Sequence, residues 1–407
     1  MTVPETDRLR VSSNPRAAPR AELYGSERGR ILNEAGFVAA EREIRSWPGY
    51  AETPLHELAG LASRLRIASL TYKDESARFG LKSFKAVGGA YAVFRLLAAT
   101  VSARTGIERV QCRRMIDGEY AAITSSVTVT CATDGNHGRS VAWGAQLFGC
   151  HCVIYIHEGV SEARRAAIAR YGAEVIRVAG NYDDSVRHAA TEAARRGWTV
   201  VSDTSYEGYR HIPIDVMHGY GVLAREIVRR MSDAPPTHVL VQAGVGGLAA
   251  SLCAVFWIAW GARRPDVVVV EPTAADCHFQ SAKAGVPTRV RGNLDTVMAG
   301  LACGEVSPAA WEILKGGASA FVAIDDSFAL DAMRALARPA PPDPAIVAGE
   351  TGASGLAALL AANQYDDVRE VLGLDRSSRV LLIGSEGDTD PEIYARIVGT
   401  DPLEARK

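Results

Sequence analysis

The chain has 407 residues, which is enough for two domains, each with a core of its own. Its 45 lysines and arginines nearly balance its 47 aspartates and glutamates, and a net charge of −2 excludes an electrostatic case for a nucleic-acid or anionic-membrane partner. The polar N-terminus lacks the apolar core of a signal peptide, and the longest apolar run, near residues 248–262, is too short to span a bilayer. We therefore expect a soluble, cytoplasmic protein.

The seven cysteines form no C-x-x-C pair and have no regular spacing. This pattern predicts buried free thiols and neither a disulfide framework nor a metal site. Cys277 and Cys303 are able to approach each other in a folded chain, and the sequence leaves open whether they pair.

Residues 1–35 are polar and arginine-rich, and they predict a poorly ordered or surface-wrapped N-terminal arm. From residue 67 onward, strands alternate with helices, which predicts a parallel α/β protein. The predicted strands are 67–72, 128–131, 152–156, 174–178, 199–201, 238–242, 267–271 and 380–383. The predicted helices are 84–98, 138–147, 161–171, 183–195, 212–231 and 248–262.

Two segments interrupt this alternation. Residues 103–126 have no clear period and predict an insertion or a surface excursion. Residues 339–344 contain four prolines, a density that permits neither a helix nor a central strand, so we expect a loop there.

Lys85 lies between a Ser-Phe dipeptide and a Gly-Gly step, where a helical pattern begins. Its apolar neighbours Phe84, Val87 and Ala90 place it on a face that packs. A desolvated lysine has a lowered pKa and is able to act as a nucleophilic Schiff-base amine. The alternative is a lysine that buries its stem and keeps its charge in water.

Residues 132–138 follow a predicted strand and open a helix. Exposed backbone N–H groups at such a position are able to hold a carboxylate, and Asn136 offers an amide to a ring hydroxyl. The Asp-Gly-Asn tripeptide is also common in ordinary turns, which is the competing interpretation.

Residues 242–249 form a glycine-rich turn between a strand and a buried helix, and such a turn cradles phosphate with its backbone N–H groups. It is not a P-loop, because no Gly-Lys-Ser/Thr follows. A dinucleotide site remains a rival, with Ala249 at the third glycine position and Glu271 at the end of the next strand. Plain close packing of helix and strand is the other alternative.

A fourth loop follows the strand at 380–383, where the hydroxyl of Ser385 is suited to bond a pyridine nitrogen without protonating it. The competing interpretation is a simple strand-end cap. A lysine combined with partners for a phosphate, a ring hydroxyl and a ring nitrogen suggests pyridoxal 5'-phosphate as the cofactor.

These loops carry a resemblance to a known family. The chain resembles the fold-type-II pyridoxal-phosphate enzymes, the serine/threonine dehydratase and tryptophan synthase β superfamily, and more narrowly the diaminopropionate ammonia-lyases. The likeness runs from about residue 37 to residue 398. The segments that carry it include Ser-Phe-Lys at 83–85, Ala-Thr-Asp-Gly-Asn-His-Gly-Arg at 132–139, Gly-Val-Gly-Gly at 244–247, Met-Ala-Gly-Leu-Ala-Cys-Gly-Glu at 298–305 and Glu-Gly-Asp-Thr-Asp at 386–390.

The resemblance implies two open parallel-sheet α/β domains with the cofactor in the cleft. It assigns residues 86–202 to a small domain and residues 36–85 and 203–407 to a large pyridoxal-phosphate-binding domain. A homodimer is usual in this superfamily, and the partner molecule is a small amino-acid substrate.

The resemblance also implies roles for particular residues. Lys85 holds the cofactor as a Schiff base and takes the Cα proton of an L-isomer, Asp134 is a second base for a D-isomer, and Asp203 is a supporting carboxylate near the distal amine. The implied cofactor-binding residues, besides Lys85, are Phe84, Asn136, Gly244, Val245, Gly246, Gly247, Leu248, Glu350 and Ser385. The implied substrate-binding residues are Ser83, Thr133, Asp134, Gly135, His137 and Asp203. From the residues alone, Asp203 also suits a turn cap and Glu350 a charge at a helix N-terminus.

The reaction implied by the resemblance is α,β-elimination of 2,3-diaminopropionate to pyruvate and two ammonia. A carboxylate at Asp134 suits a cationic β-ammonium group, whereas the hydroxyl leaving group of serine needs no anion. Ser385 stands where threonine is expected, and Leu248 where a bulkier residue is common. These departures keep open elimination or replacement on another β-substituted amino acid. A non-catalytic homologue that binds the cofactor is a separate alternative, whose expected signature, the loss of Lys85 or of the glycine-rich loop, is not found in the sequence.

Overall fold

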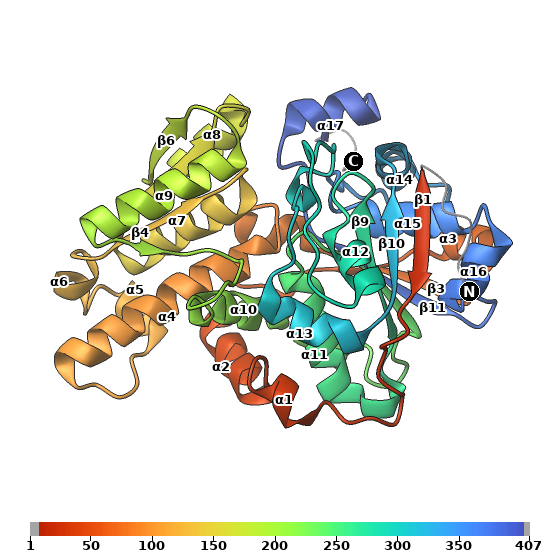
Figure 1. Cartoon of the computed structure of the whole chain (residues 1–407), viewed down its shortest axis with the longest axis horizontal. Coiled ribbons are helices and arrows are strands. Elements are labelled where there is room, and N and C mark those ends of the chain that lie inside the picture. Colours follow the sequence, from red (N-terminus) through yellow and green to blue (C-terminus); the bar gives the residue numbers. More distant parts are fainter. Residues whose placement is uncertain (1–7, 403–407) are drawn as a thin grey trace. The chain divides into compact units, whose positions relative to one another are not determined.

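The structure is a computed structural model that describes residues 8–402, and these divide into two compact units (Figure 1). Unit 1 takes its described residues from Met1–Glu34, Glu52–Ala77 and Leu223–Lys407. Unit 2 consists of Ala35–Ala51 and Arg78–Val222. Each contains one of the two sheets.

Unit 1 is built on a seven-stranded sheet with the order β1-β10-β9-β8-β11-β3-β2. Its inner strands are parallel and the two edge strands are antiparallel, so the predicted parallel sheet is confirmed except at its edges. In sheet order the strands are β1 (Leu9–Ser13), β10 (Ala318–Ile324), β9 (Asp266–Pro272), β8 (His238–Gln242), β11 (Arg379–Gly384), β3 (Ser69–Asp74) and β2 (Leu55–Glu57). Its helices are α1 (Gly25–Gly29), α3 (Ala59–Arg64), α11 (Gly247–Trp260), α12 (Cys277–Ala284), α13 (Pro308–Gly317), α14 (Asp326–Ala337), α15 (Ser354–Ala362), α16 (Asp366–Leu372) and α17 (Pro391–Val398).

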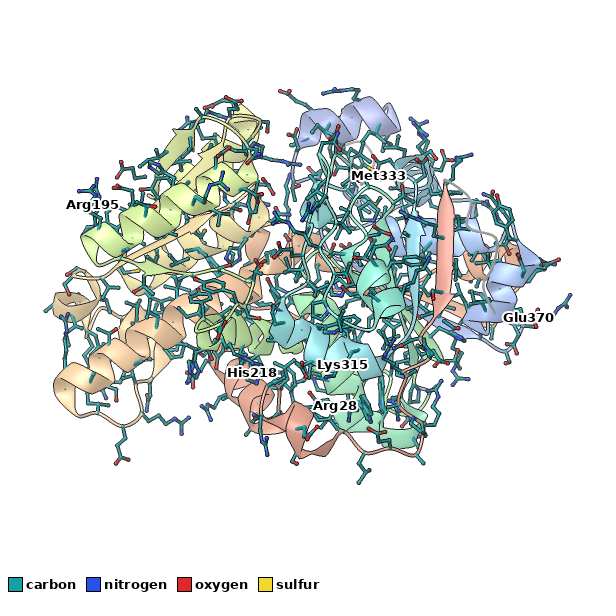
Figure 2. All side chains as sticks on the ribbon, viewed as in Figure 1. Arg28, Arg195, His218, Lys315, Met333 and Glu370 are labelled. Carbon is teal, nitrogen blue, oxygen red and sulfur yellow. The ribbon has the colours of Figure 1, made fainter. Side chains whose placement is uncertain are left out.

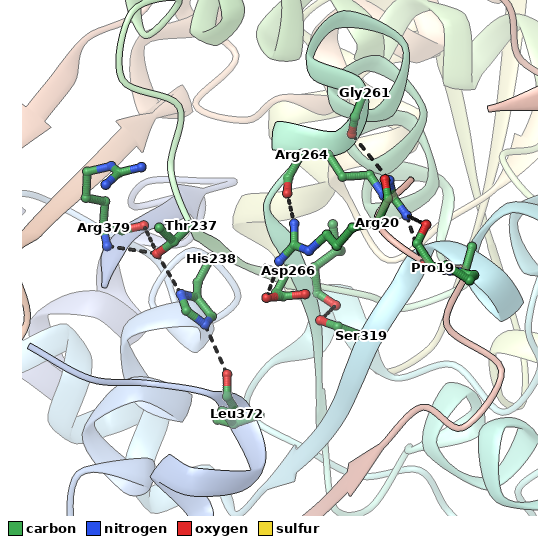
Figure 3. A network of polar contacts seen from close by, with 12 residues as sticks. Pro19, Arg20, Thr237, His238, Gly261, Arg264, Asp266, Ser319, Leu372 and Arg379 are labelled. Atoms are coloured by element: carbon green, nitrogen blue, oxygen red, sulfur yellow. Dashed lines mark hydrogen bonds and ion pairs between the residues drawn. The ribbon is translucent and has the colours of Figure 1, made fainter. Parts of the chain in front are cut away.

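The N-terminal arm, which the sequence predicts to be poorly ordered or surface-wrapped, is ordered in the residues that the structure describes. Leu9–Ser13 form β1, which pairs antiparallel with β10. Beyond it, the guanidinium of Arg264 donates to the carbonyl oxygens of Pro19 (2.7 Å) and Arg20 (2.6 Å), and Arg20 pairs with Asp266 (Figure 3). The arm is ordered because its backbone carbonyls satisfy a largely buried arginine.

Unit 2 is built on a four-stranded parallel sheet with the order β6-β5-β4-β7. The strands are β4 (Thr128–Ala132), β5 (His151–His157), β6 (Glu174–Val178) and β7 (Thr199–Val200). The helices that accompany it are α2 (Glu34–Ile44), α4 (Lys85–Thr105), α5 (Cys112–Ile116), α6 (Ala121–Thr124), α7 (Asn136–Phe148), α8 (Glu162–Ala169), α9 (Tyr182–Arg196) and the first part of α10 (His211–Arg230). The predicted alternation of strand and helix is confirmed along this stretch.

Small residues allow α4 and α7 to pack closely. A Cβ atom added at Gly144 would lie 2.7 Å from the Cα atom of Ala90, and one added at Gly89 would lie 2.7 Å from Ser140 Oγ. By length and composition α4 is apolar enough to cross a membrane, but 61% of its most apolar window is buried within the protein. It has the burial of a core helix.

The units differ from the predicted domains, because residues 36–51, 78–85 and 203–222 lie with the smaller sheet, so that Lys85 is in unit 2. The helix α2 packs on α10 through Phe37 and His218, whose ring centroids are 5.2 Å apart (Figure 2 labels His218). The helix α10 in turn lies against α4, where a side chain at Gly219 would clash with the backbone of Val87. These contacts join segments that are distant in sequence.

The structure also describes the two segments that interrupt the predicted alternation. Residues 103–126, expected to be an insertion or a surface excursion, form the end of α4 followed by α5 and α6, which bury Cys112, Met115 and Tyr120. The loop at 339–344 is confirmed. All seven cysteines, Cys277 and Cys303 among them, are free thiols.

Candidate active site

Lys85 is the first residue of α4, and its ammonium group contacts the carboxylate of Asp203. The two side chains are 20% and 17% exposed, so the pair is shielded but reachable. Nζ also lies 5.6 Å from the ring centroid of Phe84 and 6.0 Å from that of Tyr220, where aromatic faces stabilise a cation. The predicted environment of Lys85, a packed and mostly apolar face, is confirmed.

Asp203 follows β7, and it is ionised in this setting. Burial alone favours the neutral acid, but the Lys85 ammonium outweighs burial and holds the pKa of Asp203 well below its usual range. Asp203 is therefore an electrostatic partner of Lys85 rather than an acid.

His137 is buried beside Asp203, with 3.9 Å between Nδ1 and the nearer carboxylate oxygen. Burial lowers the pKa of His137, which favours the neutral ring. Its Nε2 atom lies 2.8 Å from the carbonyl oxygen of Val201, and a carbonyl only accepts, so Nε2 carries the proton. Nδ1 is then a buried acceptor without a hydrogen-bond partner among the described residues.

The loop between β4 and α7 is shaped by Thr133, whose hydroxyl oxygen accepts the N–H groups of Gly135 and Gly138 at 3.0 Å each. Gly135 is the N-cap of α7, has φ +155° and offers no side chain, so Thr133 caps the helix from two residues earlier. By contrast, α8, α9, α14 and α17 each begin with a capping side chain at the N-cap itself. The positive end of the helix dipole at this start still suits a carboxylate ligand.

Other predicted residues of unit 2 are partly committed to local contacts. Asn136 accepts a hydrogen bond from Arg139 at 2.6 Å through its side-chain oxygen, so its nitrogen is the end suited to donate to a ring hydroxyl. Ser83 is buried, and its hydroxyl oxygen accepts the N–H of Lys85 at 3.3 Å. Ser83 therefore shapes the start of α4.

Asp134 is 34% exposed and pairs with a residue that sequence reasoning missed. His157, at the end of β5, places Nε2 3.0 Å from Asp134 Oδ1. A signal was available, because Asp134 follows β4 and His157 ends the neighbouring strand, but it required knowledge of which strands pair.

The glycine-rich loop of unit 1 joins β8 to α11. Gly246 has φ +98° and is the N-cap of α11, which has no side-chain cap. A Cβ atom there would lie 2.5 Å from the ring of His278, and one at Gly244 would lie 2.9 Å from the carbonyl oxygen of Gly300. Bare N–H groups at the start of a buried helix, with no room for side chains, suit a phosphate.

Glu271 and His278 support this loop and were missed as part of the site. Both oxygens of Glu271 accept backbone N–H groups, from His278 and Phe279 at 2.8 Å each, so Glu271 caps α12. The dinucleotide interpretation fails here, because the carboxylate that would bind the ribose is buried and engaged. Burial lowers the pKa of His278 to about 4, so its ring is neutral beneath the loop.

Glu271, Cys277 and His278 also have the composition of a metal site, since their ligand atoms lie within 4.8 Å of one another. Burial raises the pKa of both Glu271 and the Cys277 thiol, which opposes the deprotonated state that metal ligation needs. With Glu271 already capping α12, the cluster is better explained as support for the phosphate loop.

Ser385 is buried in the turn after β11, and Gln242 orients it. Gln242 Nε2 lies 2.9 Å from the carbonyl oxygens of both Thr351 and Ile383, which assigns that end of the amide as the nitrogen. The same nitrogen lies 2.6 Å from Ser385 Oγ and is unable to accept a hydrogen bond, so the serine proton points elsewhere and is able to serve a ring nitrogen.

The segment that contains Glu350 is tied to this same turn. The N–H of Gly349 donates to the carbonyl oxygen of Glu386 (3.1 Å), and that of Thr351 to the Glu386 side chain (3.2 Å). The predicted residues thus gather into two groups. Unit 2 holds the lysine, the loop at 133–137 and Asp203, and unit 1 holds the phosphate loop, Ser385 and Glu350.

Comparison with known proteins accounts for both groups. A family model described as pyridoxal-phosphate dependent enzyme matches residues 46–383. The chain belongs to this family. Diaminopropionate ammonia-lyase of Escherichia coli (strain K12) is 40% identical over 382 residues, which cover 93% of this chain and 94% of the relative.

Two crystal structures of diaminopropionate ammonia lyase from Escherichia coli are similar to the whole chain. The holo form has a TM-score of 0.88 at 38% identity and covers 96% of both chains. A complex with D-serine has a TM-score of 0.87 at 38% identity, covering 96% of this chain and 97% of that one. The predicted fold-type-II architecture and the pyridoxal-phosphate cofactor are confirmed.

The residues present fit this cofactor. Lys85 would supply the amine, the uncapped start of α11 would supply N–H groups for the phosphate, and the Ser385 proton is directed away from Gln242. Nδ1 of His137 adds a buried acceptor that lacks a partner among the residues described.

Proposed function

We propose that this protein is a diaminopropionate ammonia-lyase that converts 2,3-diaminopropionate to pyruvate and two ammonia. The observation that carries the proposal is the pair of carboxylates in unit 2, Asp134 and Asp203, that accompanies Lys85. A substrate with two ammonium groups matches two anionic side chains, whereas serine or threonine has a neutral β-substituent. The 40% identity to the Escherichia coli enzyme along nearly the whole chain supports the same reaction.

Pyridoxal phosphate supplies the electron sink that stabilises negative charge at Cα when a proton leaves. Lys85 provides the amine that anchors the cofactor, and it takes the Cα proton of the L-isomer. Asp134 takes the proton of the D-isomer from the opposite face. Asp203, whose pKa the Lys85 ammonium lowers, holds that ammonium and attracts the distal amine of the substrate.

Other residues bind and orient. The N–H groups at 244–248 would hold the phosphate, Ser385 would donate to the ring nitrogen, and the side-chain nitrogen of Asn136 would donate to the ring hydroxyl. The start of α7, with Thr133 and Gly135, binds the substrate carboxylate. From the family resemblance we also propose a homodimer in the cytoplasm, which sedimentation and fractionation test.

The experiment is pyruvate release from each enantiomer of 2,3-diaminopropionate, with D- and L-serine alongside. D-serine elimination is the second candidate function, because a relative was crystallised in complex with D-serine. We expect release from both diamino enantiomers at rates that exceed those with serine. No release from either enantiomer contradicts the proposal.

The Asp134→Asn variant tests the second base. We expect D-isomer turnover to fall by about 100-fold or more, since a positioned general base contributes about 100- to 10,000-fold, with L-isomer turnover within a few fold of wild type. The control is Asp183→Asn, which removes an exposed carboxylate from α9 in the same unit. Equal losses of turnover with both enantiomers would contradict the role of Asp134 as the base for the D-isomer.

A further inference from the structure

His157 stands next to Asp134 because of the register of two neighbouring strands. β4 and β5 are parallel, and Ala132 of β4 lies opposite Tyr155 of β5. Asp134 and His157 each lie two residues further along the chain, so both are at the carboxyl-terminal ends of their strands. Their side chains meet there, with 3.0 Å between Nε2 and Oδ1, and they are 34% and 24% exposed.

The backbone after β5 decides which nitrogen of His157 carries the proton. The N–H of Gly159 points at Nδ1 across 3.1 Å, and an N–H group only donates, so Nδ1 is unprotonated in the neutral ring. The proton then lies on Nε2, which donates it to Asp134. A Cβ atom at Gly159 would lie 2.9 Å from Cε1 of His157, so a residue without a side chain permits this close turn.

The contact restricts a side chain that would otherwise rotate. Asp134 is exposed enough to sample several rotamers in water, and each additional orientation takes the carboxylate away from a reacting carbon. A hydrogen bond to Oδ1 selects one orientation and presents Oδ2 as the proton acceptor. A base that is itself oriented by a third group is a common arrangement in enzymes.

We propose that His157 is a positioning residue that orients Asp134 for proton transfer with the D-isomer, with Gly159 holding the imidazole in the required tautomer. This inference rests on the proposed function for its effect on the D-isomer. The hydrogen bond itself does not depend on that function. The chain of contacts is Gly159 N–H to His157 Nδ1, and His157 Nε2–H to Asp134 Oδ1.

The kinetic test compares His157→Leu, which keeps the volume but has no donor, with His157→Gln, whose amide is able to donate to the same carboxylate. We expect His157→Leu to lower kcat for D-2,3-diaminopropionate by about 10- to 100-fold, because small misplacements of reacting groups cost up to about 100-fold. KM and L-isomer turnover stay within about threefold. His157→Gln recovers most of the lost rate, and the control His151→Leu, at the exposed start of β5, retains both activities.

A double variant separates positioning from a merely structural role. If His157 acts through Asp134, adding His157→Leu to Asp134→Asn lowers D-isomer turnover no further than Asp134→Asn alone. Multiplicative losses, equal losses with both isomers, or an unchanged D-isomer rate in His157→Leu overturn the proposal.

Nuclear magnetic resonance of ¹⁵N-histidine-labelled protein without cofactor tests the contact independently of activity. The His157 signals, assigned by their loss in His157→Gln, are expected to show the Nε2–H tautomer and to shift in Asp134→Asn. An Nδ1–H tautomer, or signals unmoved by Asp134→Asn, overturns the hydrogen bond. If the wild-type enzyme shows these signals but does not turn over the D-isomer, His157 has no kinetic role with that isomer. The proposed role of Asp134 as a base is then wrong, whereas the hydrogen bond between His157 and Asp134 remains supported.

Discussion

Both units contain a lysine paired with a carboxylate, and the two pairs differ in their access to solvent. In unit 1, Lys73 Nζ lies 2.6 Å from Glu226 Oε2, and each side chain is 1% exposed. Lys73 also donates to the carbonyl oxygen of Thr53 at 2.9 Å. In unit 2, Lys85 and Asp203 are each about one-fifth exposed, and aromatic rings stand beside the ammonium.

A pair of an ammonium and a carboxylate group therefore has a different role in each unit. The Lys73 pair is sealed, so neither charge is able to exchange its partner for a ligand. A buried pair of this kind is tolerated because each charge is matched and hydrogen-bonded. The Lys85 pair keeps one side open, so its amine is able to leave the carboxylate and bond to a cofactor. The exposure of the side chain to solvent, more than the residue type, distinguishes a structural lysine from a reactive one.

Removing the reactive lysine is expected to have the largest effect on activity. Lys85→Ala should lower lyase activity by about 1,000-fold or more and abolish the visible absorbance of the lysine-linked cofactor, because the amine that forms the linkage is gone. Pyruvate assays and absorbance spectra measure both. The control Lys315→Ala removes a surface lysine paired with Glu312 (Lys315 is labelled in Figure 2) and should change neither. A retained absorbance band in Lys85→Ala would refute the assignment.

Removing the sealed lysine is expected to affect folding rather than chemistry. Lys73→Met leaves Glu226 buried without its partner, which costs about 3–5 kcal/mol of stability. Denaturant unfolding measures this loss, and the folded fraction should keep the absorbance of the lysine-linked cofactor. The double variant Lys73→Met/Glu226→Leu should recover part of the stability, because no unpaired charge remains. A single variant as stable as wild type would show that the pair contributes little.

The smallest expected effect concerns the loop that Lys85 depends on for its cofactor. Gly246→Ala places a Cβ atom at φ +98° and 2.5 Å from the ring of His278, so the phosphate loop must shift. We expect a loss of about 1–3 kcal/mol in stability and weaker cofactor binding in titrations of the cofactor-free protein. Gly261→Ala, at the other end of α11, has φ +54° and no atom within 4 Å, so it should leave the affinity unchanged. Equal affinities in the two variants would exclude a phosphate role for the loop.

Much of the architecture was predictable because it depends on sequence patterns that are local along the chain. Continuous apolar runs predicted the inner strands β5 and β9, and helical periodicity predicted α4 and α7. Lys85 and the glycine-rich loop stood out because glycines and a lysine in apolar company are locally unusual. The edge strand β1 was missed, since it pairs with β10 some 300 residues away and depends on backbone hydrogen bonds that carry no side-chain code.

The residues that support the site were also missed, and for a related reason. His157 reaches Asp134 through the register of β4 and β5, and Gln242 reaches Ser385 across neighbouring strands of the other sheet. Glu271 was interpreted as a candidate for ribose binding, whereas the fold uses it to cap α12. The partner of such a side chain cannot be predicted until the order and register of the strands in the sheet are known.

By itself, the sequence determined the fold class and the cofactor, and it singled out Lys85 and the glycine-rich loops, because each depends on residues close together along the chain. Only the tertiary structure decided that Lys85 contacts Asp203, that Lys73 is buried in an ion pair with Glu226, and that His157 contacts Asp134. Those outcomes depend on strand order, register and burial. Packing of distant segments sets all three, and no local pattern encodes them.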